Sequence, residues 1–259
     1  MRTVRATRYA TPLREGGSLP GVVEADDDGM YVVKFRGAGQ GPKALIAELV
    51  AGEVGRALGL RVPEIVFVDV DPVLGRTEPD QEIQDLLNAS AGLNLGIDYL
   101  PGSAAYDPVV RRTDAETASS VVWFDALVTN VDRTPRNTNM LVWHQRLWLI
   151  DHGAALYAHH APSDFRERSR GAFPQIKDHV LLPEASMLEE VDAPMSQRLT
   201  PELLGVIASL IPESWLDGGS AVFSSPDEHR AAYAEYLTAR LETPRTFVEE
   251  ARNARALSL

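Results

Sequence analysis

The spacing of apolar residues changes along this chain, and that change constrains the fold more than any other feature. Up to residue 100, short runs rich in β-branched residues alternate with turn-forming Gly, Pro and Asp. Beyond residue 113, apolar residues recur at helical spacing instead. We therefore predict an α+β fold in two lobes, a β-rich lobe over residues 1–100 and a mainly helical lobe over residues 101–259.

The first lobe is expected to begin with three consecutive antiparallel strands, over residues 4–9, 21–25 and 30–35. The last two are separated by residues 26–29, Asp-Asp-Asp-Gly. An Asp-Gly pair between two β-prone runs is typical of a tight hairpin turn, and the spacing of an EF-hand loop is missing here. The sequence therefore predicts a turn at this point rather than a cation site.

A helix is predicted over residues 42–58, followed by strands over residues 65–70 and 93–100. The helix contains Gly52 and Gly55, which lower its intrinsic stability but permit close packing against a neighbour. We expect this helix to lie against the first three strands.

The second lobe is expected to open with a helix that begins at a capping box, residues 113–116. A hairpin is predicted over residues 141–150. The helix leads to Asp132 and the hairpin leads to Asp151. This arrangement would bring the two carboxylates to the same end of one compact unit.

The remainder of the second lobe combines an irregular segment with further helices. Residues 161–194 are polar and without clear periodicity, so we expect irregular structure there. Helices are predicted to begin at Thr200 and, through a second capping box, at Ser225, and a last helix follows Pro244.

Composition excludes several classes of site and partner. The chain has no cysteine, so it contains neither a disulfide nor a thiolate metal site. Its net charge of -12 disfavours binding to nucleic acid. No apolar run is long enough to span a membrane, and the first residues lack the apolar stretch of a secretory signal. We therefore expect a cytoplasmic protein without a nucleic-acid or membrane partner.

Polar residues follow two successive elements of the second lobe, at the point where each ends. Asp132 and Asn137 lie five residues apart in one loop, and Asp151 follows the predicted hairpin. Such residues often populate turns, but their position after apolar scaffolding favours a site. Phosphoryl transfer requires a carboxylate that accepts the proton of a hydroxyl, which suits Asp132. It also requires oxygen ligands for Mg²⁺, which suits Asn137 and Asp151.

These two segments carry a family resemblance. Residues 129–139, Thr-Asn-Val-Asp-Arg-Thr-Pro-Arg-Asn-Thr-Asn, and residues 149–153, Leu-Ile-Asp-His-Gly, resemble the HipA-like kinases, a branch of the protein-kinase-like superfamily. The resemblance implies a two-lobed, protein-kinase-like fold. It also implies that Asp132 is the catalytic base and that Asn137 and Asp151 are metal ligands.

The first lobe fits the same resemblance. Residues 31–35 resemble the kinase strand whose lysine, here Lys34, reaches the nucleotide phosphates, and Glu48 resembles the helix acid that pairs with it. Glu48 lies beside the packed side of its predicted helix, where an unpaired charge would be costly, and Glu53 is the alternative partner. His152 stands where ordinary kinases have the phenylalanine of Asp-Phe-Gly, so the packing role of that ring is not expected here.

Two further segments are candidates for nucleotide binding. Gly16, Gly17 and Ser18 lie between the first two predicted strands, where a phosphate-covering loop is expected, although a plain turn explains them nearly as well. The resemblance also makes Ser18 a candidate for autophosphorylation. The connection between the lobes, which commonly holds adenine in the resembled fold, contains Asp98, Tyr99 and Leu100.

The sequence therefore predicts a kinase that uses ATP and Mg²⁺ and transfers the γ-phosphoryl group to a hydroxyl acceptor. A protein Ser/Thr is the first choice of acceptor, and the hydroxyl of a small molecule is the nearest alternative. Two other functions use the same residues: a nucleotide-binding pseudokinase that acts as an interaction module, and a nucleotidyltransferase.

Overall fold

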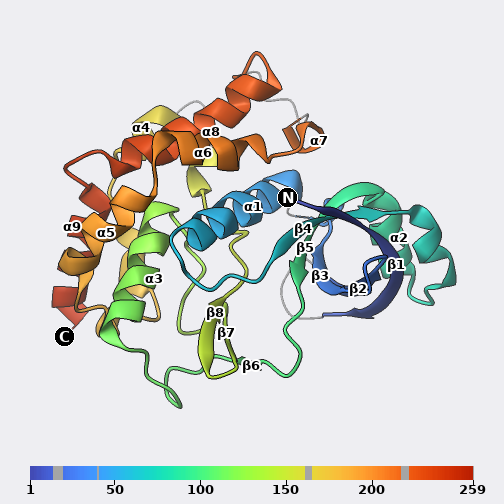
Figure 1. Ribbon diagram of the computed structural model, residues 1–259, viewed down its shortest axis with the longest axis horizontal. Coiled ribbons are helices and arrows are strands. Elements are labelled where there is room, and N and C mark those ends of the chain that lie inside the picture. The colour runs from blue at the N-terminus through green and yellow to red at the C-terminus, as the bar shows by residue number, and fades with distance from the viewer. Residues whose placement is uncertain (14–19, 40, 161–164, 217–221, 259) are drawn as a thin grey trace.

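The N-terminal strands close into a barrel. The structure, a computed structural model, describes residues 1–13, 20–39, 41–160, 165–216 and 222–258. The barrel strands follow the order β1-β2-β3-β5-β4 (Figure 1) and are β1 (Thr3–Pro12), β2 (Gly21–Ala25), β3 (Met30–Lys34), β4 (Ile65–Val70) and β5 (Gly92–Asp98). The first three pair antiparallel, as predicted, and β1 pairs in parallel with β4 to close the barrel.

The turn between β2 and β3 is the hairpin that the sequence predicts. Asp28 has a φ of 62°, and the Ala25 N–H donates to the Gly29 carbonyl over 3.0 Å. An Asp27 carboxylate oxygen accepts the Gly29 N–H over 3.1 Å. The acidic run therefore stabilises the turn and joins it to the first strand, where the Arg5 N–H donates to Asp26 Oδ1 over 2.9 Å.

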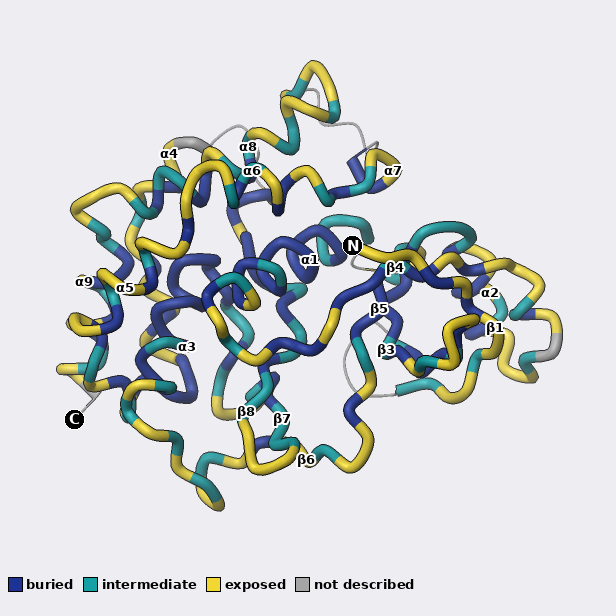
Figure 2. Tube along the Cα trace, in the orientation of Figure 1, coloured by how far each residue is buried: buried dark blue, intermediate teal, exposed yellow. Residues whose placement is uncertain are grey.

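Helix α1 (Gly41–Ala57) is buried over most of its surface (Figure 2), unlike the half-buried helix of an ordinary protein surface. It packs against α6 (Pro201–Ser209) and α7 (Glu213–Leu216) and also against β4 and β5 of the barrel. A Cβ at Gly52 would lie 2.4 Å from Cδ1 of Ile65 on β4, so a larger residue would force that side chain to move. The expectation that this helix lies against the first three strands was therefore wrong.

Two apolar clusters organise the molecule. One fills the barrel and includes side chains of α2 (Gln81–Ala89), which follows a 3₁₀ turn, η1 (Pro72–Thr77). The other joins α1 to the C-terminal helices. Figure 1 shows α1 between the barrel and those helices. The division of the chain at residues 100 and 101 remains a prediction.

The C-terminal part combines a small sheet with helices. The sheet has the order β6-β7-β8, with β6 (Ala104–Ala105), β7 (Met140–Trp143) and β8 (Arg146–Leu149). The remaining helices are α3 (Ala115–Leu127), α4 (Phe165–Ser169), α5 (Leu188–Arg198), α8 (Pro226–Leu241) and α9 (Thr246–Ser258). Among the described residues, 3₁₀ turns lie at η2 (Tyr157–His160), η4 (Pro174–Asp178) and η5 (Leu182–Glu184).

The predicted helix starts are confirmed with one shift. Thr200 and Ser225 cap α6 and α8, and their hydroxyls accept N–H groups of Leu203 and Glu228 over 3.2 and 3.1 Å. At α3 the cap is Asp114 rather than Thr113, the first residue of the predicted capping box. Its carboxylate accepts the Thr117 N–H over 2.8 Å and, as an anion, also complements the helix dipole.

The prediction of irregular structure over residues 161–194 was wrong at the short helix α4 and in its last part. Helix α5 begins at Leu188 and continues through Pro194 to Arg198. Leu188, Val191 and Met195 are buried and recur on one face, against α3 and α9. Tertiary packing of this face outweighs the cost of an internal proline.

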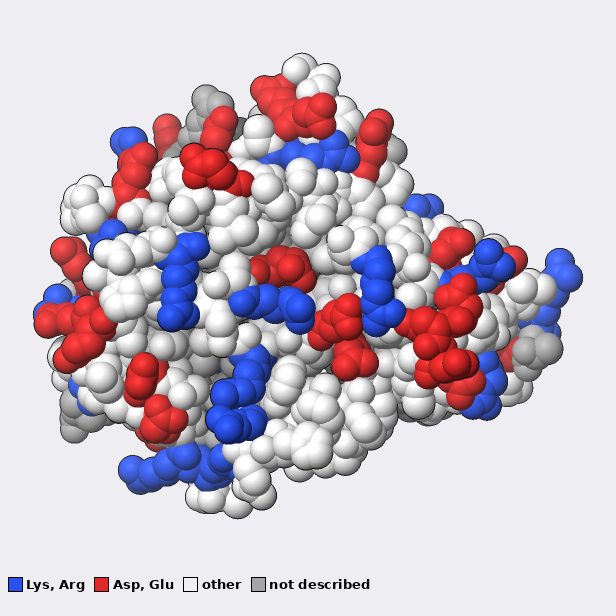
Figure 3. All heavy atoms as spheres, in the orientation of Figure 1, with Lys and Arg blue, Asp and Glu red and all other residues white. Residues whose placement is uncertain are grey.

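The surface in Figure 3 carries acidic and basic side chains interspersed, without a continuous basic region on that face. Within the described ranges, none of the helices combines the length and the apolar character needed to cross a membrane.

Arg240 of α8 fixes the end of α3. The guanidinium is 3% exposed and donates to the carbonyls of Leu127 and Ala126 over 2.7 and 2.8 Å. It also donates to the carbonyls of Ser169 and Gly171 over 3.2 and 3.0 Å. The last carbonyls of a helix need such partners, and a cation also complements the negative end of the helix dipole.

We predict that Arg240→Met lowers the free energy of unfolding by about 2–4 kcal/mol, because buried carbonyls lose a charged donor while the side-chain stem is retained. Denaturant unfolding measures the change. The matched control is Arg252→Met on α9, where the arginine is half exposed beside Glu189. A change within about 0.5 kcal/mol is expected there. Equal losses in the two variants would contradict the proposed role of Arg240.

Candidate active site

Lys34 joins three elements at the centre of the molecule. Its Nζ, on β3, lies 2.5 Å from Oε2 of Glu48 on α1 and also contacts Oδ1 of Asp151, which follows β8. Lys34 and Glu48 are 8% and 1% exposed, whereas the Asp151 side chain is 46% exposed. The ion pair expected from the sequence is therefore present and buried, with Asp151 at its solvent-facing side.

The charges of the pair keep each other ionised. Burial would lower the pKa of Lys34, but the negative charges of Glu48 and Asp151 outweigh it and raise the pKa. Burial would raise the pKa of Glu48, but the Lys34 charge and the hydrogen bond from His152 lower it to about 2. Both groups are therefore charged at neutral pH.

His152 holds the second oxygen of Glu48. Its Nδ1 lies 3.1 Å from Glu48 Oε1, and the ring is fully buried with its edge against Phe124. The residue that replaces the usual phenylalanine thus keeps a packed position and adds a polar contact. With Lys34 on one oxygen and His152 on the other, the orientation of the Glu48 carboxylate is determined.

The loop after α3 places Asp132 and Asn137 side by side. Thr129 has a φ of 53°, which reverses the chain, and the Asp132 N–H donates to Asn130 Oδ1 over 3.2 Å. Asp132 Oδ2 accepts Nδ2 of Asn137 over 2.8 Å and Nδ2 of Asn139 over 3.2 Å. The donor end of Asn137 therefore faces the carboxylate, and its oxygen is the group that a cation would bind.

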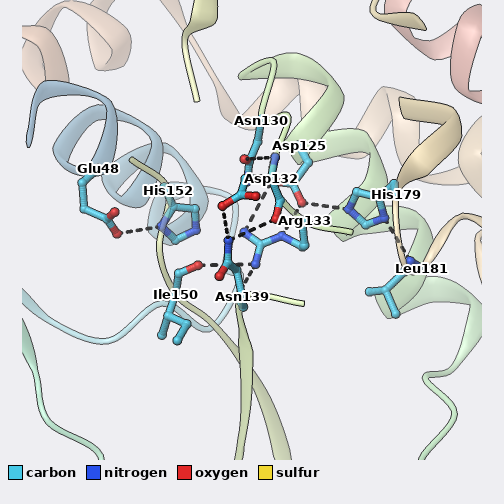
Figure 4. Close-up of polar contacts among 10 residues, drawn as sticks. All are labelled: Glu48, Asp125, Asn130, Asp132, Arg133, Asn139, Ile150, His152, His179 and Leu181. Atoms are coloured by element: carbon cyan, nitrogen blue, oxygen red, sulfur yellow. Dashed lines mark hydrogen bonds and ion pairs between the residues drawn. The ribbon is translucent and has the colours of Figure 1, made fainter. Parts of the chain in front are cut away.

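The buried side chain of Arg133 lies against this loop and contacts its backbone (Figure 4). Arg133 Nε donates to Asp125 Oδ2 over 2.5 Å, and both side chains have no exposed surface. Its Nη1 contacts the carbonyls of Asn139 and, over 3.5 Å, Ile150. Sequence reasoning missed these two residues as parts of the site. The available signal was Asp125 itself, an acid inside an otherwise apolar helical run, which must have a partner when buried.

Asp151 sits in a restricted backbone conformation. Its φ is 55°, a region that residues other than glycine seldom occupy and that clusters at functional sites. The preceding Ile150 N–H donates to the Asn139 carbonyl over 3.0 Å. A Cβ at Gly153 would lie 3.4 Å from Lys34 Nζ, an ordinary contact distance, so Gly153 lies beside the lysine but the available space does not require glycine.

The connection at Asp98, Tyr99 and Leu100 is only partly open to a ligand. The N–H groups of Asp98 and Tyr99 donate to the carbonyls of Glu64 and Met30 over 2.8 and 3.0 Å. A backbone contact to adenine would have to use other groups of this segment. Leu100 is buried and Tyr99 is partly exposed. Gly16, Gly17 and Ser18 lie outside the described residues.

Comparison with known protein families identifies the family of this chain. Residues 8–244 match the sequence model of the HipA-like kinases. The chain belongs to the HipA-like kinase family. Comparison with curated proteins gave no match.

This HipA-like kinase has a protein-kinase-like fold. The Helicobacter pylori proinflammatory kinase CtkA aligns with a TM-score of 0.53 at 13% identity, over 93% of this chain and 95% of that one. The Golgi casein kinase with Mn and ADP bound aligns at 11% identity over 95% of this chain and 74% of that one, with a TM-score of 0.48.

The candidate ligands in this HipA-like kinase suit a metal ion that takes only some of its ligands from the protein. The described residues contain no group of three or more His, Cys, Asp or Glu side chains that could hold a metal alone. Mg²⁺ characteristically binds to one or two protein oxygens together with substrate phosphates and water. Asn137 and Asp151 fit that requirement, since both offer oxygen and the Asp151 carboxylate is accessible to solvent.

For this HipA-like kinase we predict strong coupling between Lys34 and Glu48. Lys34→Met and Glu48→Gln should each lower the free energy of unfolding by about 3–5 kcal/mol, because each removes the buried opposite charge that its partner needs. The double variant should lose at least about 2 kcal/mol less than the sum of the two. Denaturant unfolding of the wild type, the two single variants and the double variant gives the coupling free energy.

The exposed pair Arg8 and Glu24 is the matched control, since its side chains are 66% and 37% exposed. The same cycle, with Arg8→Met and Glu24→Gln, should show a coupling below about 1 kcal/mol. Additive losses at Lys34 and Glu48 would contradict the buried pairing.

Proposed function

We propose that this HipA-like kinase transfers the γ-phosphoryl group of ATP to a hydroxyl acceptor in a Mg²⁺-dependent reaction, with a protein Ser/Thr as the acceptor. The observation that carries the proposal is the position of Lys34, which contacts Glu48 and Asp151 together. In protein kinases, the strand lysine, its helix glutamate and the metal-binding aspartate must all be in place for activity. Here these three groups are already assembled.

Asp132 is proposed to act on the acceptor. The acceptor oxygen attacks the γ-phosphorus, the bond from that phosphorus to the bridging oxygen of ADP breaks, and the acceptor proton passes to the Asp132 carboxylate. The amides of Asn137 and Asn139 hold one carboxylate oxygen in place. They leave the other oxygen for the acceptor.

Asn137 and Asp151 are proposed to hold Mg²⁺, and Lys34 is proposed to bind the phosphates. The metal ion would neutralise the negative charge that the transferring phosphoryl group carries. Lys34 keeps its positive charge despite burial, so it supplies a fixed cation beside the same phosphates. We assign the adenine to the segment around Asp98, Tyr99 and Leu100, and the phosphate-covering loop to Gly16, Gly17 and Ser18.

Labelled ATP tests the reaction and the acceptor together. With γ-labelled ATP, Mg²⁺ and a cell extract, label should appear on a protein. Label on a soluble compound would identify a small-molecule kinase. Binding of ATP without turnover would identify a pseudokinase, and transfer from α-labelled ATP would identify a nucleotidyltransferase.

We predict that substitutions of Asp132 and Asp151 have different effects on ATP affinity and on turnover. Asp132→Asn should lower kcat by about 100-fold to 10,000-fold, because it removes the proton acceptor. An amide oxygen can still accept from Asn137, so the affinity for ATP and Mg²⁺ should stay within about threefold. Asp151→Asn should lower both turnover and Mg²⁺-dependent ATP affinity. Calorimetry and a γ-phosphate transfer assay measure the two quantities.

The control is Asp69→Asn, since Asp69 is an exposed acid on β4, away from the site. It should leave affinity and turnover unchanged. Loss of ATP affinity in Asp132→Asn with normal affinity in Asp151→Asn would reverse the two roles. Normal turnover in both variants would refute the kinase assignment.

A further inference from the structure

A histidine from a segment distant in sequence belongs to the buried hydrogen-bond network that supports the loop carrying Asp132 and Asn137. His179, between η4 and η5, is 5% exposed, and its Nε2 lies 2.9 Å from Asp125 Oδ2. Figure 4 shows it on the far side of Asp125 from Asp132 and Asn139. The neighbouring Val180 N–H donates to the Arg133 carbonyl over 3.0 Å, so this segment contacts both α3 and the loop that follows it.

The surroundings of His179 determine which nitrogen carries its proton. The Leu181 N–H donates to Nδ1 over 3.0 Å, so Nδ1 must present a lone pair. The proton is therefore on Nε2, which donates to Asp125. Burial lowers the pKa of His179, although the Asp125 carboxylate opposes this effect. The ring is a neutral hydrogen-bond donor.

Asp125 receives donors on both carboxylate oxygens. Oδ2 accepts His179 Nε2 and Arg133 Nε, and Oδ1 accepts Asn130 Nδ2 over 2.8 Å and Arg133 Nη2 over 3.4 Å. A buried carboxylate is stable only when its lone pairs are matched in this way. Without His179, Asp125 would lose one donor and could rotate, and the contact to Arg133 would change with it.

Arg133 connects this carboxylate to the proposed catalytic groups. It follows Asp132 directly, and its Nη1 contacts the carbonyls of Asn139 and Ile150. Asn139 donates to Asp132, and Ile150 precedes Asp151. One guanidinium thus holds the chain segments that carry the proposed base and a proposed metal ligand.

We propose that His179 is a positioning residue for phosphoryl transfer: its hydrogen bond to Asp125 orients Arg133, which keeps the catalytic loop and the segment before Asp151 in one arrangement. The proposal rests on the proposed function. It makes the segment of residues 174–184 a part of the catalytic apparatus, although none of its side chains need touch ATP.

Two substitutions separate the two hydrogen bonds of His179. In His179→Gln, the amide nitrogen occupies the place of Nε2 and can still donate to Asp125. In His179→Asn, the amide oxygen occupies the place of Nδ1 and can still accept from Leu181, but the bond to Asp125 is lost. A purely structural role in the segment of residues 174–184 would make Asn the better replacement.

We expect His179→Gln to keep kcat within about fivefold of the wild type, and His179→Asn to lower kcat by about 100-fold, since small displacements of catalytic groups have effects of that size. The KM for ATP should change less than kcat in both, because Lys34, the proposed phosphate-binding residue, is held by Glu48 rather than by this network. Gln175→Asn, an exposed change in the same segment, should leave kcat unchanged.

A second measurement separates this inference from the proposed function. Hydrogen–deuterium exchange over residues 128–140 should be faster in His179→Asn than in His179→Gln, whether or not the wild type transfers phosphate. A wild type without turnover but with this difference would overturn the proposed function and support the positioning role. Equal exchange in the two variants, or a kcat in His179→Asn at or above that of His179→Gln, would overturn the positioning role. If His179→Asn does not fold, a folded His179→Gln with a 100-fold loss of kcat overturns it.

Discussion

The architecture of this protein depends on one buried pair of opposite charges. Lys34 and Glu48 are both almost fully buried, and burial of either charge alone would cost several kcal/mol. Their attraction therefore requires β3 and α1 to meet at one point. The same lysine reaches Asp151, and the same glutamate reaches His152, so the segment after β8 must meet them as well. Three parts of the chain that are far apart in sequence are thereby brought together at one place.

Much of the local structure could be predicted, because its causes lie within a few residues. The bounds of β2 and β4 follow from runs of β-branched residues, and the turn at Asp28 follows from its Asp-Gly pair. The closure of the barrel by β1 and β4 could not be predicted, since parallel pairing leaves no mark in either strand. Helix α5 was missed for a related reason: packing against α3 and α9 stabilises it despite Pro194.

In the proposed site, too, some residues could be predicted from the sequence and others could not. Asp132, Asn137 and Asp151 follow recognisable motifs, and the burial of Glu48 could be inferred from its helix. The residues that hold these groups in place were harder to identify. Asp125, Arg133 and His179 meet through tertiary contacts, and a lone histidine in a polar segment does not reveal its partner. Here the residues proposed to contact a substrate lie in recognisable sequence motifs. The residues that hold them in place were identified only because the structure buries a charged side chain, Asp125, with its partners.

The packing of α1 has a mechanical consequence. Its apolar residues share one cluster with Ile65 of β4, Leu95 of β5 and the C-terminal helices. Glu48 on the same helix pairs with Lys34 of β3. A rotation of the barrel away from α1 would break these apolar contacts together with the ion pair. Such a rotation is therefore opposed by packing as well as by charge, and α1 links the barrel to the C-terminal helices.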